Sequence, residues 1–125
     1  FKFWESDIAD KTCNAPDYPE VAQKALIEMQ RQVGTLGFDE NGIAKRGLLV
    51  RHLVMPSGLA GTGKIMKFIA TTISPDTFVN LMDQYRPCGK AYHIEELNRA
   101  LSEQEFANAV SEAKAAGIHR FAIPL

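Results

Sequence analysis

The stretch Gly47-Leu48-Leu49-Val50-Arg51-His52-Leu53-Val54-Met55, closed by Pro56, decides the fold. Its branched and long apolar side chains show little polar alternation, which is typical of a parallel strand buried on both faces. Proline ends such a strand because it has no main-chain N–H to donate. A similar run from Thr77 to Met82 predicts a second buried strand, and two short strands are predicted at residues 1–4 and 120–124.

Three helices are predicted between these strands. The first has Asp17 as its expected N-cap and ends at Gly34, with apolar residues at helical spacing between them. The second covers residues 64–72. The third opens with a capping box, in which the side chains of Ser102 and Glu105 each bond a free main-chain N–H of the other residue. The remaining segments are a loop or short helix over 5–13, a polar connection over 38–46 and a long loop over 83–101, with a short helix near 95–99.

The order of these elements predicts the α/β class, with alternating βα units on a parallel sheet. The length of 125 residues suits one domain or one piece of a larger one, and residues 1–125 contain no repeat or interdomain linker. Ligands of such sheets bind beyond the carboxyl ends of the strands. The segments expected there are 5–7, 56–62 and 83–90.

Composition narrows the function classes. Fourteen Lys and Arg face fifteen Asp and Glu, which gives a net charge of -1 and no basic field for a nucleic acid or a membrane surface. No apolar run reaches the roughly 18–20 residues that span a bilayer, and no signal peptide is recognised at the start. Two distant cysteines, Cys13 and Cys88, fit a reducing cytoplasm and are too few to ligate an iron–sulfur cluster or structural zinc alone.

The segment from Gly58 to Lys64 has the spacing G-x-x-x-x-G-K of a phosphate-binding loop, and Asp83 follows the next apolar strand. Position 65 is Ile, however, where that motif needs a hydroxyl for the metal. The alternative is an ordinary glycine-bearing turn after a strand.

Several other polar residues are candidates for chemistry. Arg51 and His52 point to opposite faces of their strand, so Arg51 either lines a ligand cavity or pairs with a carboxylate of a neighbouring strand, and His52 is expected in the core. The loop from Asp83 to Lys90 either carries a reactive Cys88, activated by nearby cations, or is a polar surface loop. Lys2 lies in the predicted aromatic strand, where it is either buried with a partner or, at a sheet edge, extends to water. His93 and His119 are expected at the surface.

Four stretches together resemble one family: residues 2–4, 14–18, 47–56 and 79–87, of which RHLVMP and NLMDQYRP are the most specific. They are similar to the C-terminal part of radical S-adenosylmethionine proteins related to pyruvate formate-lyase activating enzymes. The resemblance implies the C-terminal half of an open (β/α)6 partial barrel.

In that family a [4Fe–4S] cluster on a C-x-x-x-C-x-x-C loop binds S-adenosylmethionine, which yields a 5′-deoxyadenosyl radical, and some members install a glycyl radical on a partner enzyme. The resemblance implies cofactor-binding roles for Lys2 and Arg51. Gln84 is a candidate where family members have a histidine, and Asn80 is a further candidate. A protein substrate of the glycyl-radical type is the implied partner.

The cluster motif itself is absent from this sequence, so the chain is expected to be a portion of such an enzyme and inactive alone. A non-catalytic α/β binding or interaction module is the main alternative, and a phosphate-loop nucleotide hydrolase is a third. Half a barrel would leave two sheet edges free, which predicts self-association.

Overall fold

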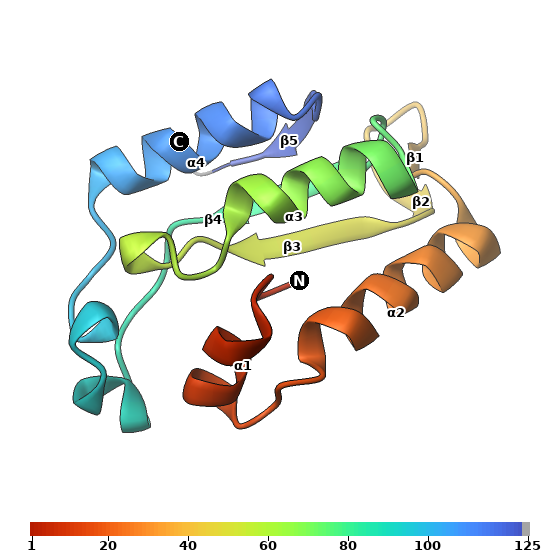
Figure 1. Cartoon of the computed structure of the whole chain (residues 1–125). Helices are drawn as coiled ribbons and strands as arrows, with labels where there is room; N and C mark the ends of the chain where they lie inside the picture. The colour runs from red at the N-terminus through yellow and green to blue at the C-terminus, as the bar shows by residue number, and fades with distance from the viewer. Residues whose placement is uncertain (124–125) are drawn as a thin grey trace.

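The computed structural model describes residues 1–123, and its centre is a three-stranded parallel sheet (Figure 1). The strands are β3 (Leu49–Leu53), β4 (Phe78–Met82) and β5 (Arg120–Ala122), in the spatial order β3-β4-β5. The predicted α/β class with βα units on a parallel sheet is therefore confirmed. Of the strand expected at 120–124, the first three residues form β5, and Pro124 lies outside the described residues.

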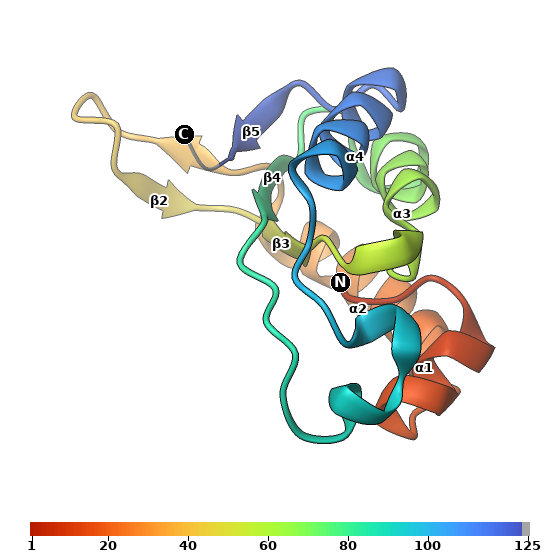
Figure 2. The same ribbon diagram turned by 90° about the vertical axis from the view of Figure 1, so that its left-hand side faces the viewer.

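Helices pack on one face of this sheet (Figure 2). They are α2 (Tyr18–Val33), α3 (Thr62–Phe68), which continues as a π-helical turn over Ile69–Ile73, and α4 (Glu103–Ala115). A further helix, α1 (Ser6–Cys13), lies beside α2. The core forms between these helices and the sheet, and its most deeply buried members are Ile65, Met66, Ile69, Val79, Leu81 and Ala113.

The expectation that the strands are buried on both faces is wrong. Along β3 the side chains alternate, because Val50 and His52 are buried while Leu49 and Arg51 are exposed. The helices cover the face that carries Val50 and His52, and no helix of the described residues lies on the opposite face of the sheet (Figure 2). Arg51 therefore reaches water instead of a dry interior.

The strand predicted at residues 1–4 is also wrong. The main-chain nitrogen of Phe1 donates to the carbonyl of Arg51 at 2.9 Å, so the segment does lie beside the free edge of β3. The carbonyl of Phe1, however, accepts from Nδ1 of His52 at 2.6 Å, and the N–H of Trp4 bonds to the carbonyl of Ala60 at 3.1 Å. These side-chain and loop partners replace a regular ladder of strand hydrogen bonds.

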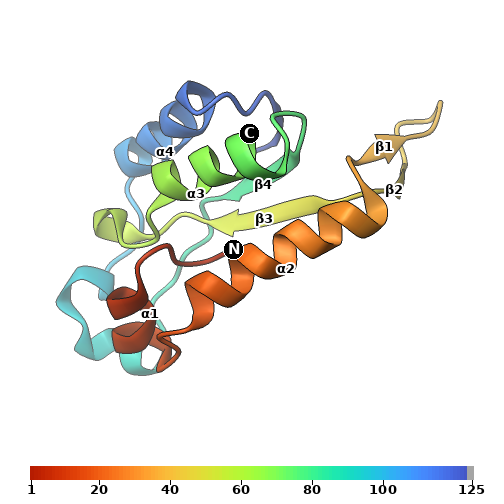
Figure 3. The same ribbon diagram turned by 45° about the vertical axis from the view of Figure 1, so that its right-hand side comes forward.

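Residues 38–46 are not a plain polar connection, because they contribute to a short antiparallel hairpin. Its strands are β1 (Gly37–Phe38) and β2 (Ala44–Arg46), and it projects beyond the end of α2 (Figure 3). Oδ1 of Asp39 accepts the N–H groups of Asn41 and Ile43 at 2.9 Å each, which fixes the predicted turn. The strands are two and three residues long, which is too short for alternation of apolar and polar residues to predict them.

The helix boundaries agree with most of the sequence-based expectations. The capping box of α4 is present, and both of its hydrogen bonds form. Helix α2 ends before Gly34, although Asp17 makes no side-chain hydrogen bond at its start. Residues 83–101 form a long connection with two short 3-10 turns, Gly89–His93 and Glu95–Leu97. Among residues 1–123, no helix combines the length and the apolar character needed to span a bilayer.

Gly47 sits where two main-chain segments meet, and we predict that Gly47→Ala is severely destabilising. Its φ of +121° disfavours any side chain, and an added Cβ would overlap the main chain of Thr35 and Leu36. We expect a loss of at least about 3 kcal/mol in the free energy of unfolding, measured by urea denaturation.

Gly42→Ala is the matched control for this change. It also has a positive φ of +74°, but nothing lies within 4 Å of an added Cβ, so only backbone strain of about 1–2 kcal/mol is expected. Equal losses for the two variants would contradict the close approach at Gly47.

His52 makes the stability of the fold depend on pH. Its ring is fully buried between Phe1 and Thr62, and Nε2 lies 2.9 Å from the Thr62 hydroxyl. Burial lowers the pKa of His52 from 6.5 to about 4. As pH falls, the unfolded chain therefore binds a proton at His52 near pH 6.5, whereas the folded chain binds it only near pH 4. The contribution of neutral His52 to the free energy of unfolding is fully present above pH 6.5, and about 3 kcal/mol of it is lost as pH drops to 4.

Urea denaturation of the wild-type chain and of His52→Gln across this range tests the assignment. The variant should lose the pH slope, whereas His93→Gln, at an exposed histidine, should keep it. A slope that survives in His52→Gln would show that another group causes it.

Candidate functional site

A hollow of about 250 Å³ lies on the uncovered face of the sheet, at the carboxyl ends of its strands. It brings together three of the four residues predicted to bind a cofactor, which are Arg51, Asn80 and Gln84. Its remaining wall is apolar and comes from Met82, Ala122 and Ile123.

Strand register explains why these residues meet. Arg51 of β3 pairs with Asn80 of β4, which pairs in turn with Ala122 of β5. Paired residues of neighbouring strands share a face, and alternate residues along β4 return to that face. Asn80, Met82 and, just beyond the strand, Gln84 therefore line the same hollow.

Arg51 carries a positive charge that no carboxylate neutralises among residues 1–123. The polar side-chain contact of its guanidinium is with Sδ of Met82, at 3.1 Å. The alternative of an ion pair with a carboxylate on a neighbouring strand is thus not met. A guanidinium offers a fork of N–H donors, which is a geometry that suits an anion such as a carboxylate.

Lys2, the fourth predicted residue, does not line this hollow. It is exposed, and its main-chain N–H donates to the hydroxyl of Tyr18 at 2.9 Å. The predicted cofactor-binding role of Lys2 depends on a regular strand at residues 1–4, from which its side chain would point to one face of the sheet. Residues 1–4 form no such strand, and neither this hollow nor the larger one beside residues 58–64 is lined by both Lys2 and Arg51.

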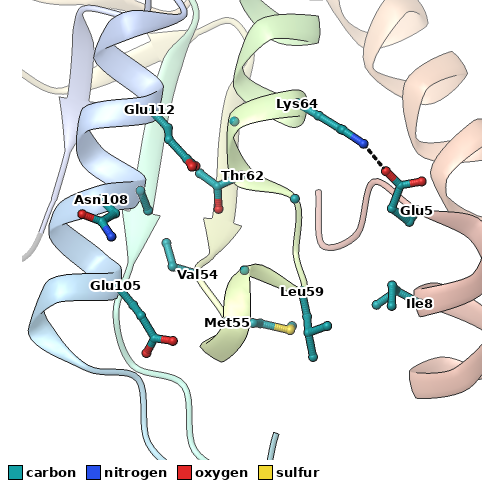
Figure 4. A pocket seen from close by; sticks show the side chains of 14 residues that line it. Glu5, Ile8, Val54, Met55, Leu59, Thr62, Lys64, Glu105, Asn108 and Glu112 are labelled. Atoms are coloured by element: carbon teal, nitrogen blue, oxygen red, sulfur yellow. Dashed lines mark hydrogen bonds and ion pairs between the residues drawn. The ribbon is translucent and has the colours of Figure 1, made fainter. Parts of the chain in front are cut away.

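A second, larger hollow of about 430 Å³ lies beside the glycine-rich segment from Gly58 to Lys64 (Figure 4). It does not resemble a phosphate site. Nζ of Lys64 is held by the carboxylate of Glu5, and the hydroxyl of Thr62 is bound to His52. Glu105 and Glu112 add two more carboxylates to the wall, which would repel a phosphate.

The loop leading into this hollow is held in a strained shape. Ser57 has a φ of +60°, which is uncommon for a residue other than glycine. Its N–H donates to Oε1 of Glu105 at 2.8 Å, and Arg99 donates to both oxygens of Glu105 at 2.7 and 2.9 Å. Arg99 and these N–H groups hold the pKa of Glu105 well below its usual range. The capping box predicted from the sequence thus also anchors the loop, a role that local sequence does not reveal.

The remaining candidates stay apart. Cys13 and Cys88 are free and exposed, and His93 and His119 are exposed as expected. Tyr85, in contrast, is buried, and its hydroxyl donates to the carbonyl of Leu97 at 2.8 Å, which ties down the long connection. Within residues 1–123, no three side chains of His, Cys, Asp or Glu come together as metal ligands.

An uncharacterized protein from Methanocaldococcus jannaschii is 40% identical over 115 residues, which cover 91% of this chain. The chain spans only 30% of that relative's length. No family model matches the chain, and no solved structure matches it.

We predict that Glu105→Ala lowers the free energy of unfolding by about 2 kcal/mol in urea denaturation. The change removes one half of the capping box and leaves Ser57 and Arg99 without their carboxylate. Glu103→Ala, at an exposed residue in the same first turn, should change stability by less than about 0.5 kcal/mol. Equal effects would mean that the carboxylate does not anchor the loop.

Proposed function

We propose that this chain is part of a radical S-adenosylmethionine protein related to pyruvate formate-lyase activating enzymes. In this proposal the hollow on the uncovered sheet face binds the amino-acid end of S-adenosylmethionine. The observation that carries it is the meeting of Arg51, Asn80 and Gln84 in one hollow, with no carboxylate of residues 1–123 on Arg51.

The chemistry of the hollow suits that ligand. The methionine end of the cofactor carries a carboxylate and an ammonium group. The guanidinium of Arg51 can hold the carboxylate through paired, charge-assisted hydrogen bonds. The amides of Asn80 and Gln84 offer both donors and acceptors, so they can accept from the ammonium group as well. The apolar remainder of the wall, Met82, Ala122 and Ile123, can contact the aliphatic part of the ligand.

The iron–sulfur cluster of the family does not fit the described residues of this chain. Its two cysteines are exposed and separated, and residues 1–123 supply no ligand cluster. We therefore propose that the cluster belongs to the rest of a longer protein, in line with a relative of which this chain spans 30%. In the family, S-adenosylmethionine and the cluster together supply the radical chemistry, and this chain's residues bind and orient the cofactor.

The wider architecture is proposed on the same basis. Within residues 1–123 no further strand pairs with the outer edge of β3 or β5, and this and the uncovered face are consistent with the C-terminal half of a (β/α)6 partial barrel. A glycyl-radical-type enzyme as protein substrate, a cytoplasmic location, and self-association of the chain through its free edges are parts of the same proposal.

The test is made on the full-length protein, expressed without oxygen and reconstituted with iron and sulfide. We predict that it releases 5′-deoxyadenosine from S-adenosylmethionine. Arg51→Ala should weaken binding of S-adenosylmethionine by about tenfold to a hundredfold, because a charge-assisted pair to the carboxylate is lost. Binding is measured by equilibrium dialysis.

Arg31→Ala is the control, because Arg31 lies on the exposed side of α2 and pairs with Glu28. It should bind S-adenosylmethionine like the wild type. A reconstituted protein that releases no 5′-deoxyadenosine would overturn the assignment to this family. Release of 5′-deoxyadenosine with unchanged binding by Arg51→Ala would keep the family and overturn the role of the hollow.

A further inference from the structure

The larger hollow, of about 430 Å³, is not used by the function proposed above. It lies on the helix-covered side of the sheet, whereas Arg51 points from the opposite face. Its walls are α1, the loop after β3, the start of α3 and one side of α4 (Figure 4). The volume falls within the roughly 300–1,000 Å³ that small-molecule sites occupy.

Most of the lining is apolar. Ile8 comes from α1, Val54 and Met55 follow directly after β3, Leu59 comes from the loop and Ala109 from α4. Three glycines also line the hollow, and because they have no side chains they leave its space open: Gly58, Gly61 and Gly63. A ligand of this hollow therefore needs a compact apolar body.

The charges of the lining select the polar end of that ligand. Glu5, Glu105 and Glu112 line the hollow against a single cation, Lys64. Glu5 is already paired with Lys64. Both oxygens of Glu105 are occupied by Arg99 and by the N–H groups of Ser57 and Ser102, so this carboxylate serves as a fixed part of the wall.

Glu112 is different, because it has no ion pair within residues 1–123. Figure 4 shows its carboxylate reaching from α4 toward the start of α3. There it lies against Gly63, where an added Cβ would come within 3.4 Å of it. Asn108, one turn earlier on α4, lines the same wall, and its Oδ1 already accepts from Gln104 at 2.8 Å, so Glu112 is the acceptor on this wall that a cationic group can reach.

We propose that this hollow binds a small primary amine with a compact apolar body, whose ammonium group is received by Glu112. The apolar lining accounts for the body of the ligand, and the excess of carboxylates accounts for its positive charge. The same charges act against carboxylates and phosphates.

Three probes of one shape separate charge from burial: cyclohexylammonium, cyclohexanol and cyclohexanecarboxylate. Each is titrated into the chain while the amide signals of Leu59 and Gly63 are followed by NMR. Cyclohexylammonium should bind at least about tenfold more tightly than cyclohexanol, and cyclohexanecarboxylate should bind most weakly. If cyclohexanol binds as tightly as the amine, or the carboxylate binds best, the proposal is wrong.

Two variants assign the charge. Glu112→Gln should weaken amine binding by about tenfold, whereas Glu103→Gln, at an exposed residue of the same helix, should leave it unchanged. Lys64→Gln removes the competing cation and should tighten amine binding about twofold to fivefold. Unchanged affinity in Glu112→Gln, or weaker amine binding in Lys64→Gln, would overturn the proposal. If Glu112→Gln does not fold, Lys64→Gln and the three probes still decide.

Discussion

The right-handed crossover connections between the parallel strands determine how this structure is arranged. β3, β4 and β5 are neighbours in the order of the sequence, and each step to the next parallel strand is made through a helix. Right-handed crossovers that advance in one direction across a sheet put their helices on the same face. Helices α3 and α4 therefore cover one face, joined there by α2, and the other face is left with Arg51 and Asn80 in the open. Both the core and the candidate cofactor site follow from this division.

Local signals in the sequence predict the main helices and the central strands of the sheet. The apolar runs gave β3 and β4, the capping box gave the start of α4, and strand alternation separated Arg51 from His52. The covered and uncovered faces could not be predicted in this way, because an apolar run does not say how many helix layers it faces. The hairpin was missed because its strands are so short. Residues 1–4 were misassigned because the carbonyl of Phe1 bonds to the ring of His52 in place of a strand neighbour.

The candidate site was predictable in part. A resemblance to a family singled out Arg51, Asn80 and Gln84, but their meeting depends on the pairing of Arg51 with Asn80, which only the register of the sheet supplies. The anchoring of the loop by Glu105 also depends on a contact between distant parts of the chain, since Ser57 lies 48 residues away in sequence, and local sequence patterns do not predict such a contact. In the glycine-rich segment a local pattern is present without the function it suggests. Its spacing matches a phosphate-binding loop, but carboxylates from α4 and from the residue before α1 surround it and would repel a phosphate.

The two hollows lie on opposite sides of the sheet. The one that contains Arg51 is on the uncovered face, and the acidic, largely apolar one is among the helices. The central claim is that the open face holds the amino-acid end of S-adenosylmethionine through Arg51. A crystal structure of the full-length protein with the cofactor bound tests it most directly. The account predicts the guanidinium of Arg51 within hydrogen-bond distance of the cofactor's carboxylate, with Asn80 and Gln84 beside it. A cofactor bound elsewhere, with Arg51 paired to a carboxylate of the protein, would contradict it.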